Sequence, residues 1–497
     1  MTLPSLRRPT VKIELRLTML LIILCVSVLS YLGCGGTGSS TGESQVLARV
    51  EVPAYLEDLN LPVYADLEDA AGTYYALVIA TRTQLNRTEA TYRVIDEYTP
   101  GTCYLIALED VEGARSEAAG LVNILYDDGE HIIVRYRSEL SELLPDLGFD
   151  LKLMSQTPIN FNAVELSAMV KSAFSSAVSI SEKNPKVEAM LRAVTEENIK
   201  LSTEKLSGEK PVVVDAAPYT ILTRHTKSGT PVQKATQYVY ERLKDMGLTP
   251  SFSEWTFEFE GESLSNRNVV GEIKGQSTPE EVVLLIAHLD SISKADDGIE
   301  PGADDNASGC VGLLTAAEIM RAYKFKRTVR FVFTTGEEQA MLGGKAYAEK
   351  AKKEGQKIVA VLNLDMIGYS KATDPPVKPK QQIKIRHWKN KTGYSMDLPI
   401  AQTYVDVVKT YGMDQVFEAV IEDDGEVTSD HSPFWDTKVY PAAWAIEYAE
   451  KGYLNPKMHS RDDRVNIPGI HSMNLPYYAA VVKAAMGTAA HLAETMD

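Results

Sequence analysis

The stretch Glu281–Ser291, EVVLLIAHLDS, contains an uninterrupted apolar run that ends in a histidine and an aspartate. A strand that is apolar on both of its faces is typical of the interior of a parallel sheet that helices cover on both sides. His288 and Asp290 then lie at the carboxyl end of this strand, which is where α/β proteins place their binding sites. The stretch therefore predicts both a fold class and the place of a functional site.

The sequence around this strand alternates between strand and helix patterns. Further apolar strands are predicted at 328–338 and 357–369, and amphipathic or apolar helices at 235–247, 311–323 and 344–355. This alternation is typical of an α/β domain. We expect residues 211–497 to form it, with a mostly parallel sheet and helices on both faces.

The preceding part of the chain reads differently. Residues 46–160 hold short β-rich runs separated by turn residues, and they predict a smaller β-rich N-terminal domain. A helical connector is expected over 161–210. For the β-rich domain, three roles remain open: an inhibitory pro-segment, a module that gates the substrate, or a wall-binding domain.

The first 33 residues resemble a secretory signal. Four basic residues precede the apolar run 17–32, and Gly33-Cys34 follows it. This pattern resembles a bacterial lipoprotein signal, in which Cys34 becomes the lipidated N-terminus and 34–45 forms a Gly/Ser-rich tether. An uncleaved N-terminal anchor and a plain secretory signal are the alternatives. We expect a protein of the cell envelope that is bound to the membrane through its N-terminus.

Composition restricts the partners. The 497 residues are 44% hydrophobic and 24% charged, with a formal net charge of −17. Such an acidic chain is not suited to binding the phosphate backbone of nucleic acids, so no nucleic-acid partner is expected.

Acidic residues gather at the ends of the predicted strands. Glu337 and Glu338 end one strand, Asp365 ends another, and Asp304 and Asp305 lie in the loop after His288. Carboxylates brought together at one rim repel each other and are costly to remove from water, and a bound cation resolves both problems. Imidazole with carboxylates suits zinc, and a bridging carboxylate suits a pair of metal ions. A second imidazole would complete the set, and His459 is the best candidate.

These motifs, in this order, resemble the zinc exopeptidase family that includes secreted bacterial leucyl aminopeptidases, glutamate carboxypeptidase and glutaminyl cyclases (metallopeptidase family 28). The similarity covers about residues 190–490. The segments that carry it are AHLDS, GADDNASG, GEE, LDMIGY, SDHSPF and the H-S-x-x-D pattern that begins at His459.

The resemblance implies two zinc ions and a role for each ligand. His288 and Asp365 match the ligands of one zinc, and Glu338 and His459 match those of the other. Asp305 matches the aspartate that bridges both metals, and the peptide bond that follows it is cis in the family.

The resemblance also implies catalytic roles for two further residues. Glu337 matches the general base, and Asp290 matches the carboxylate that orients the imidazole of His288. Neighbouring side chains of an extended segment point apart, so Glu338 can bind a metal while Glu337 faces a water that bridges the metals. Glu337 can take the proton of that water and pass it to the leaving amine.

The sequence therefore predicts a di-zinc exopeptidase, in the first place an aminopeptidase that acts on peptides. A glutaminyl cyclase-like acyltransferase, a carboxypeptidase of the same fold and a non-catalytic binding protein are the alternatives. One departure from the family concerns the residue before His459. Several relatives have a tyrosine there that helps to hold the oxyanion, and this chain has Met458.

Overall fold

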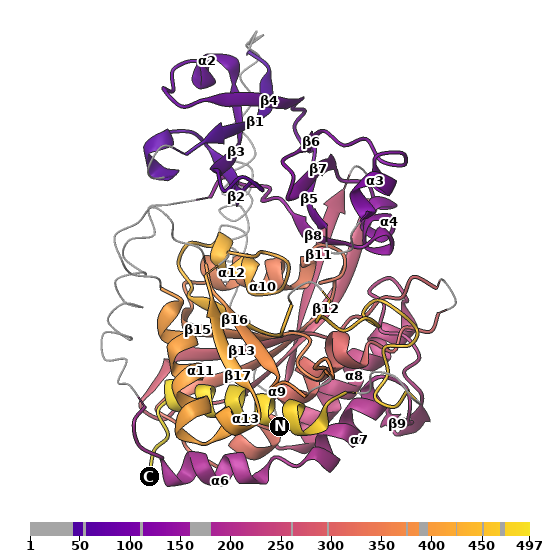
Figure 1. The fold of residues 1–497 in the computed structure, drawn as a ribbon, viewed down its shortest axis with the longest axis vertical. Coiled ribbons are helices and arrows are strands. Elements are labelled where there is room, and N and C mark those ends of the chain that lie inside the picture. Colours follow the sequence, from indigo (N-terminus) through magenta and orange to yellow (C-terminus); the bar gives the residue numbers. More distant parts are fainter. Residues whose placement is uncertain are drawn as a thin grey trace, which may run out of the picture. The chain divides into compact units, whose positions relative to one another are not determined.

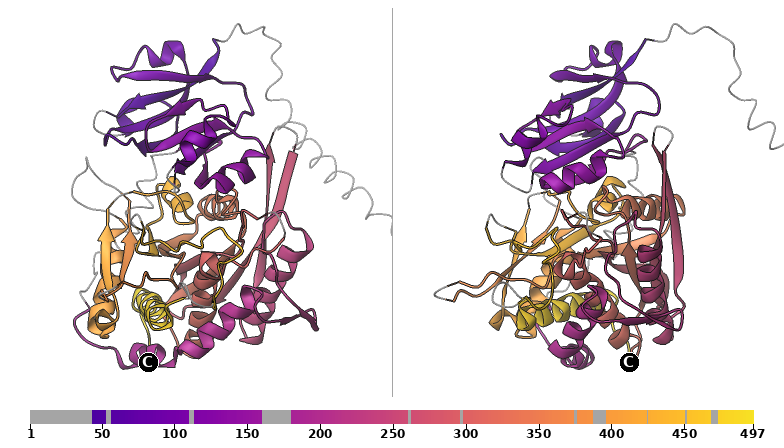
Figure 2. Two further views of the ribbon diagram at one scale, coloured as in Figure 1. Left: turned by 45° about the vertical axis from the view of Figure 1, so that its right-hand side comes forward. Right: turned by 90° about the vertical axis from the view of Figure 1, so that its right-hand side faces the viewer.

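The computed structural model describes most of the chain after the predicted leader. The described residues are 43–52, 56–109, 113–159, 180–259, 262–295, 298–373, 376–386, 396–423, 425–449, 452–467 and 473–497. The signal segment, Cys34 and nearly all of the helical pattern at 164–180 lie outside these ranges. Residues 45–497 form one compact unit (Figures 1 and 2). Within the described part of the chain, no helix is both long enough and apolar enough to cross a bilayer.

The region before residue 160 contains two four-stranded antiparallel sheets. The first has the order β2-β3-β1-β4 and the second β6-β7-β5-β8. The elements of the first are β1 (Gln45–Glu51), η1 (Leu56–Leu59), β2 (Val63–Glu68), β3 (Tyr74–Thr81), α2 (Arg82–Leu85) and β4 (Tyr92–Glu97). Those of the second are β5 (Tyr104–Glu109), α3 (Ala114–Ala118), β6 (Tyr126–Asp127), β7 (His131–Arg135), α4 (Leu140–Leu147) and β8 (Phe149–Leu153).

The two sheets share an apolar core. Strands of this region alternate their side chains between two faces, so that Leu47, Leu77 and Ile79 meet Tyr104 and Ile106 in one cluster. Val46, Ala48 and their neighbours on the other face of the first sheet form a separate cluster. The β-rich character predicted for 46–160 is therefore confirmed.

Two helices and a small hairpin follow. They are α6 (Pro185–Ala193), α7 (Glu196–Leu206), β9 (Val212–Val214) and β10 (Ala217–Tyr219). Asn184 caps α6 by accepting from the amides of Lys186 and Val187, and Thr195 caps α7 through the amide of Asn198. These caps divide the helical pattern at 187–206 into two helices.

The largest sheet has eight strands in the order β11-β12-β14-β13-β15-β18-β16-β17. The strands are β11 (Ser251–Phe259), β12 (Glu262–Ile273), β13 (Thr278–His288), β14 (Arg327–Thr334), β15 (Lys357–Leu364), β16 (Lys380–Lys384), β17 (Glu418–Glu422) and β18 (Ala442–Glu447). The helices and turns of this region are α8 (Thr230–Asp245), η2 (Ala303–Ser308), α9 (Gly309–Met320), α10 (Leu342–Lys353), α11 (Leu398–Thr410), η3 (Met413–Gln415), α12 (Ser432–Asp436) and α13 (Leu475–Leu492).

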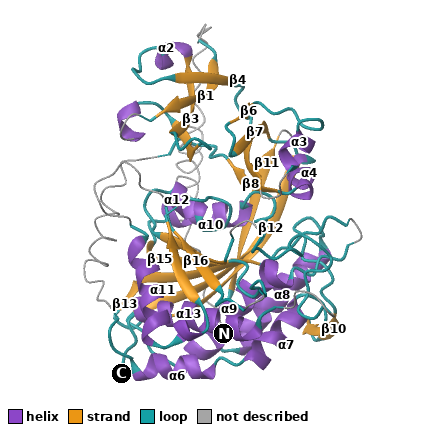
Figure 3. Ribbon diagram, viewed as in Figure 1, coloured by secondary structure: helices purple, strands orange, loops and turns teal. Residues whose placement is uncertain are grey.

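The middle of this sheet is parallel and its outer parts are mixed. Strands β14, β13, β15 and β18 pair in parallel, whereas β11, β12 and β14 pair antiparallel and β16 runs antiparallel to β18. The predicted α/β class is confirmed, with antiparallel pairings on both sides of a parallel centre (Figure 3).

Strand β13 is buried on both faces, as its sequence indicates. Val283, Leu285 and Ala287 pack into the core formed with α8, α9, α11 and α13. The alternate residues of β13, from Val282 to Ile286, pack into a second core with α10 and α12 on the opposite face. Figure 1 shows α10 and α12 on one side of the sheet and α9 and α13 on the other. The carboxyl end of β13 is thereby fixed between two helical layers.

Truncation of this strand tests its contribution to stability. Because Leu285 is fully buried, we expect Leu285→Ala to lower the free energy of unfolding by about 2–5 kcal/mol. Val213→Ala in β9 is the control, because Val213 is 64% exposed, and we expect it to change stability by less than about 0.5 kcal/mol. Urea unfolding measures both, and equal losses would contradict the central position of β13.

Candidate metal centre

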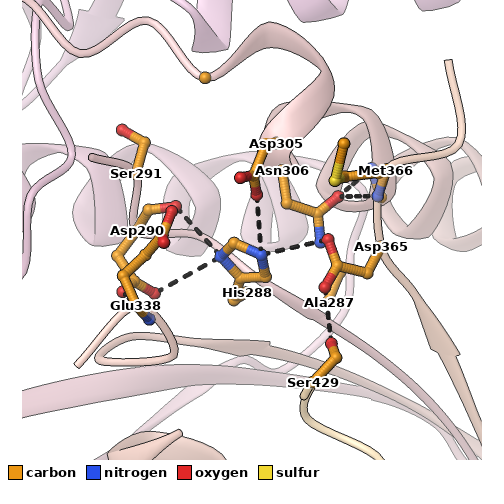
Figure 4. Close-up of polar contacts among 12 residues, drawn as sticks. Ala287, His288, Asp290, Ser291, Asp305, Asn306, Glu338, Asp365, Met366 and Ser429 are labelled. Atoms are coloured by element: carbon orange, nitrogen blue, oxygen red, sulfur yellow. Dashed lines mark hydrogen bonds and ion pairs between the residues drawn. The ribbon is translucent and has the colours of Figure 1, made fainter. Parts of the chain in front are cut away.

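The ends of the parallel strands bring the predicted site residues together. His288 is the last residue of β13, Glu337 and Glu338 follow β14, and Asp365 directly follows β15. Figure 4 shows His288 among Asp305, Asp365, Asp290 and Glu338.

Asp305 and His459 reach the same place from loops. Asp305 lies in η2, where its backbone and that of Asn306 depart from helical values, and the peptide bond between them is cis. The cis bond implied by the family resemblance is therefore confirmed. His459 lies in the segment between β18 and α13.

The side chains form two groups that share Asp305. In the first, Nε2 of His288 lies 3.2 Å from Oδ1 of Asp305 and 3.2 Å from Oδ1 of Asp365. In the second, Nε2 of His459 lies 3.0 Å from Oδ2 of Asp305 and 3.2 Å from Oε2 of Glu338. Each oxygen of Asp305 therefore lies beside a different histidine, and each of these histidines also lies beside a different second carboxylate.

These spacings fit zinc coordination. Two ligand atoms at about 2.0–2.1 Å from a tetrahedral zinc ion lie about 3.3 Å from each other. The observed separations within both groups are close to that value. One ligand atom each of His288, Asp305 and Glu338 also lies within 4.8 Å of the others, so that the two groups adjoin.

Burial makes a cation the natural partner of these groups. The exposed fractions of His288, Asp305, Glu338, Asp365 and His459 are all 8% or less. Removal from water raises the pKa of Glu338 to about 7, with the charge of Asp305 adding to the effect. Burial opposes the charged form of His459, but the facing carboxylates Glu338 and Asp305 raise its pKa well above the usual value. Three carboxylates and two imidazoles thus face each other in a site removed from water.

Glu337 differs from Glu338 in its surroundings. It is partly exposed, and removal from water, together with the neighbouring carboxylates Asp365 and Glu338, raises its pKa well above the usual value. A carboxyl group with a raised pKa binds a proton more readily than an exposed carboxylate does, which suits a group that accepts and returns protons.

Asp290 holds the site in place through its carboxylate. Its Oδ2 accepts from the hydroxyl of Thr226 at 3.0 Å and from the amide of Glu338 at 3.2 Å. Nδ1 of His288 lies 3.2 Å from the backbone carbonyl oxygen of Asp290 and 3.8 Å from its carboxylate. Asp290 therefore links the segments that carry His288 and Glu338. That its carboxylate orients the imidazole of His288 stays a prediction.

Asp463 and Asn455 support the Asp305 segment and carried no role in the sequence analysis. The carboxylate of Asp463 accepts from the amides of Asp304 and Asp305 at 3.0–3.1 Å. Asn455 donates to Asp304 Oδ2 at 3.1 Å, and Asp304 Oδ1 accepts from the amide of Gly368 at 2.8 Å. Asp304 is thus a structural acceptor. The H-S-x-x-D pattern ends at Asp463 and was the signal for this role.

Ser429 supports another ligand. Its hydroxyl donates to Oδ2 of Asp365 at 2.6 Å and accepts from Nδ2 of Asn363 at 2.7 Å. Asp365 can therefore turn its other oxygen toward His288 (Figure 4). The SDHSPF motif begins at Ser429, but its sequence did not show which member reaches the site.

Arg224 is a buried cation beneath the site. Its guanidinium donates to four backbone carbonyls: those of Leu289 at 2.6 Å, Leu206 at 3.0 Å, Pro301 at 2.6 Å and Gly302 at 2.9 Å. Leu289 lies between His288 and Asp290, and Gly302 precedes the Asp305 segment. One side chain thus fixes the backbone next to two of the predicted ligands.

Substitution of Asp463 tests the support of the Asp305 segment. In Asp463→Ala, both acceptor oxygens are removed, so the buried amides of Asp304 and Asp305 lose their partner. We expect the metal-free protein to lose about 1–3 kcal/mol of stability in thermal or urea unfolding. Asp462→Ala is the matched control, because Asp462 is an exposed neighbour. Equal stability of the two variants would contradict the role given to Asp463.

Comparison with known proteins connects this geometry to a family. Residues 268–477 match the family model Peptidase family M28. The chain is 26% identical over 308 residues to a probable leucine aminopeptidase of Arthroderma otae, covering 60% of this chain and 76% of the relative. It is 28% identical over 292 residues to leucine aminopeptidase 1 of Aspergillus niger, covering 56% and 67%. A probable zinc metalloprotease of Pyrenophora teres f. teres is 39% identical over 114 residues, covering 22% and 24%.

Solved structures share the fold. The LapA aminopeptidase of Legionella pneumophila matches with a TM-score of 0.53 at 19% identity, covering 80% of this chain and 99% of LapA. LapB of the same organism also matches with a TM-score of 0.53, at 16% identity, covering 79% and 100%. Residues 180–497 are less than two thirds of the chain, so both matches extend into the region before residue 180. Residues 268–477 are therefore a peptidase family M28 domain, and the protein is a zinc-dependent hydrolase of the metallopeptidase class.

Proposed function

We propose that this protein is a di-zinc aminopeptidase that removes N-terminal residues from peptides. The observation that carries the proposal is the division of Asp305 between two complete ligand groups, one with His288 and Asp365 and one with His459 and Glu338. A single metal can take two imidazoles, but here the two imidazoles lie on opposite oxygens of one carboxylate, which is the arrangement expected when that carboxylate bridges two ions. The leucine aminopeptidase names of the relatives support the same reaction.

The residues of the chain divide the work. When bound, zinc ions supply Lewis acidity, which polarises a peptide carbonyl and lowers the pKa of water. Glu337 follows the strand end beside Glu338 and, as a base, accepts a proton from the attacking water. The same carboxyl group then donates that proton to the departing amine, for which its raised pKa is suited. Asp290, Ser429 and Asp463 hold the ligand-bearing segments in position.

The names of the relatives support a preference for apolar N-terminal residues. They include a probable leucine aminopeptidase and leucine aminopeptidase 1, so peptides that begin with leucine should be preferred over those that begin with aspartate.

The two-metal arrangement separates this proposal from its alternatives. A glutaminyl cyclase-like acyltransferase is expected to work with one metal, and a non-catalytic relative is expected to have lost ligands. Both ligand groups are complete in this chain. Carboxypeptidase action is distinguished by substrates blocked at one end: acetylation of the peptide N-terminus should abolish cleavage, and amidation of the C-terminus should not.

Substitution of Glu337 tests the proposed base. We expect Glu337→Gln to lower kcat on leucyl-p-nitroanilide by about 10²–10⁴-fold, because the amide cannot accept the proton. Zinc content should remain two ions per chain, since Glu337 is not a proposed ligand. Glu349→Gln is the control, because the side chain of Glu349 is 55% exposed on α10 and should leave both quantities unchanged.

Substitution of Glu338, the proposed metal ligand next to Glu337, should change the zinc content. Glu338→Gln should lower the bound zinc toward one ion per chain and reduce activity with it. A chelator should abolish activity of the wild-type protein, and added zinc should restore it. Hydrolysis that survives both Glu337→Gln and metal removal would contradict the proposed function.

We also propose that the protein is held at the cell envelope through lipid on Cys34. The support is the sequence pattern alone: the basic residues, the apolar run 17–32, Gly33-Cys34 and the tether that follows. In bacteria fed a labelled fatty acid, Cys34→Ser should abolish labelling and release the protein from the membrane fraction. Cys25→Ser, within the apolar run, is the control and should remain labelled. Equal labelling of both variants would contradict lipidation at Cys34.

A further inference from the structure

Helix α4 of the β-rich region contacts the loop that follows β10. Glu142 of α4 receives two cationic partners: Nε2 of His225 lies 2.8 Å from Oε2 of Glu142, and Nζ of Lys227 lies 2.6 Å from Oε1. Lys227 also donates to the hydroxyl of Ser141 at 3.1 Å and to the carbonyl of Ser138 at 3.3 Å. Glu142 thereby joins α4 to both sides of residue 226.

The residues next to these cations hold the metal centre. Arg224 precedes His225 and donates to the carbonyls of Leu289 and Gly302. Thr226 lies between His225 and Lys227, and its hydroxyl donates to Asp290 at 3.0 Å. The loop 224–227 therefore connects α4 to the backbone beside His288 and to the carboxylate of Asp290, which accepts from the amide of Glu338.

The same region also contacts the segment that carries Glu337 and Glu338. Leu105, Leu144 and other buried residues of β5, β7, β8 and α4 share an apolar core with Trp255 of β11 and with Leu342. Nε1 of Trp255 donates to the hydroxyl of Thr335 at 3.1 Å, and the amide of Leu342 donates to the carbonyl of Gly336 at 2.7 Å. The turn from 335 to 342 is thus packed against the β-rich region on one side and carries both glutamates.

We propose that residues 103–153 act as a built-in support that positions the metal ligands, with Glu142 as the polar contact to the loop 224–227. The proposal rests on the proposed function only in taking zinc as the occupant of the site. Two contacts support it. Glu142 binds the loop 224–227, which holds the segments of His288 and Glu338, and the apolar core of the region includes Leu342 of the turn that carries Glu337 and Glu338. Separating such a core would expose fully buried side chains, among them Leu342 and Leu144. An inhibitory segment made to be released needs a contact that can open without disturbing the site.

Reversal of the charge at Glu142 in the full chain tests this support. We expect Glu142→Lys to weaken zinc binding about tenfold, in the range found for residues that orient metal ligands, and to lower kcat more than it changes KM. Glu139→Lys is the matched control, because Glu139 directly precedes α4 and its side chain is 67% exposed. It carries the same charge change and should leave zinc affinity and kcat within about twofold of wild type.

A rescue variant separates this role from general damage to the fold. Lys227→Glu alone should weaken zinc binding, and Glu142→Lys combined with Lys227→Glu should recover part of the loss, because one of the two ion pairs of residue 142 is restored with its charges exchanged. If Glu142→Lys does not yield folded protein, Glu142→Gln takes its place and should show a smaller loss in the same direction. Zinc affinity is measured by competition with a chromogenic chelator, which does not depend on the substrate.

The outcomes distinguish this proposal from the proposed function. Wild-type protein that binds no zinc would contradict the proposed function itself. Wild-type protein that binds zinc, together with Glu142→Lys or Glu142→Gln variants that match Glu139→Lys in zinc affinity and kcat, would overturn the support role. Higher activity in the Glu142 variants would also overturn it, since it would show that the region restrains the enzyme.

Discussion

The structure depends on carboxylates that are kept close together and away from water. Asp305 is the centre of this arrangement, because each of its oxygens lies beside one histidine, and each histidine lies beside one further carboxylate. The desolvation of these groups is unfavourable unless positive charge is present, and two imidazoles supply only part of that charge. Repulsion between these carboxylates would move the ligands apart in the absence of cations. The sharing of Asp305 therefore explains why many hydrogen bonds hold the surrounding segments in place.

The hydrogen bonds that hold the ligand-bearing segments join side chains to the backbone. Asp463 accepts the amides of Asp304 and Asp305, Asp304 accepts the amide of Gly368, and Arg224 donates to carbonyls on two loops. Backbone groups cannot change rotamer, so a bond to the backbone fixes a ligand segment more firmly than a bond between two flexible side chains. These hydrogen bonds join loops from separate strand ends. The distances between the ligand atoms therefore depend on how these loops are held together.

The sequence predicted the parts of this arrangement that depend on local pattern. The apolar run 282–287 indicated β13 and its end at His288, and the acidic residues after other strands indicated the same rim. Contacts between distant segments could not be predicted in this way. Arg224 lies in a stretch with no periodicity that marks it as buried, and Glu142 resembles any other acidic residue on a helix surface. The antiparallel placement of β16 beside β18 likewise depends on which strand edge is left free after the parallel centre has formed.

The β-rich region covers an aromatic face at one edge of the large sheet. Strands β11 and β12 are an antiparallel hairpin at one edge of the large sheet, and Trp255, Phe257 and Phe259 lie on one face of β11. An edge strand with such an aromatic face would be an exposed liability in a peptidase domain that stood alone. The sheet β6-β7-β5-β8 and α4 cover that face, and the same contact reaches the turn that carries Glu337 and Glu338. Because one apolar core both protects the edge and fixes the catalytic turn, the two regions are expected to fold and to function as one unit.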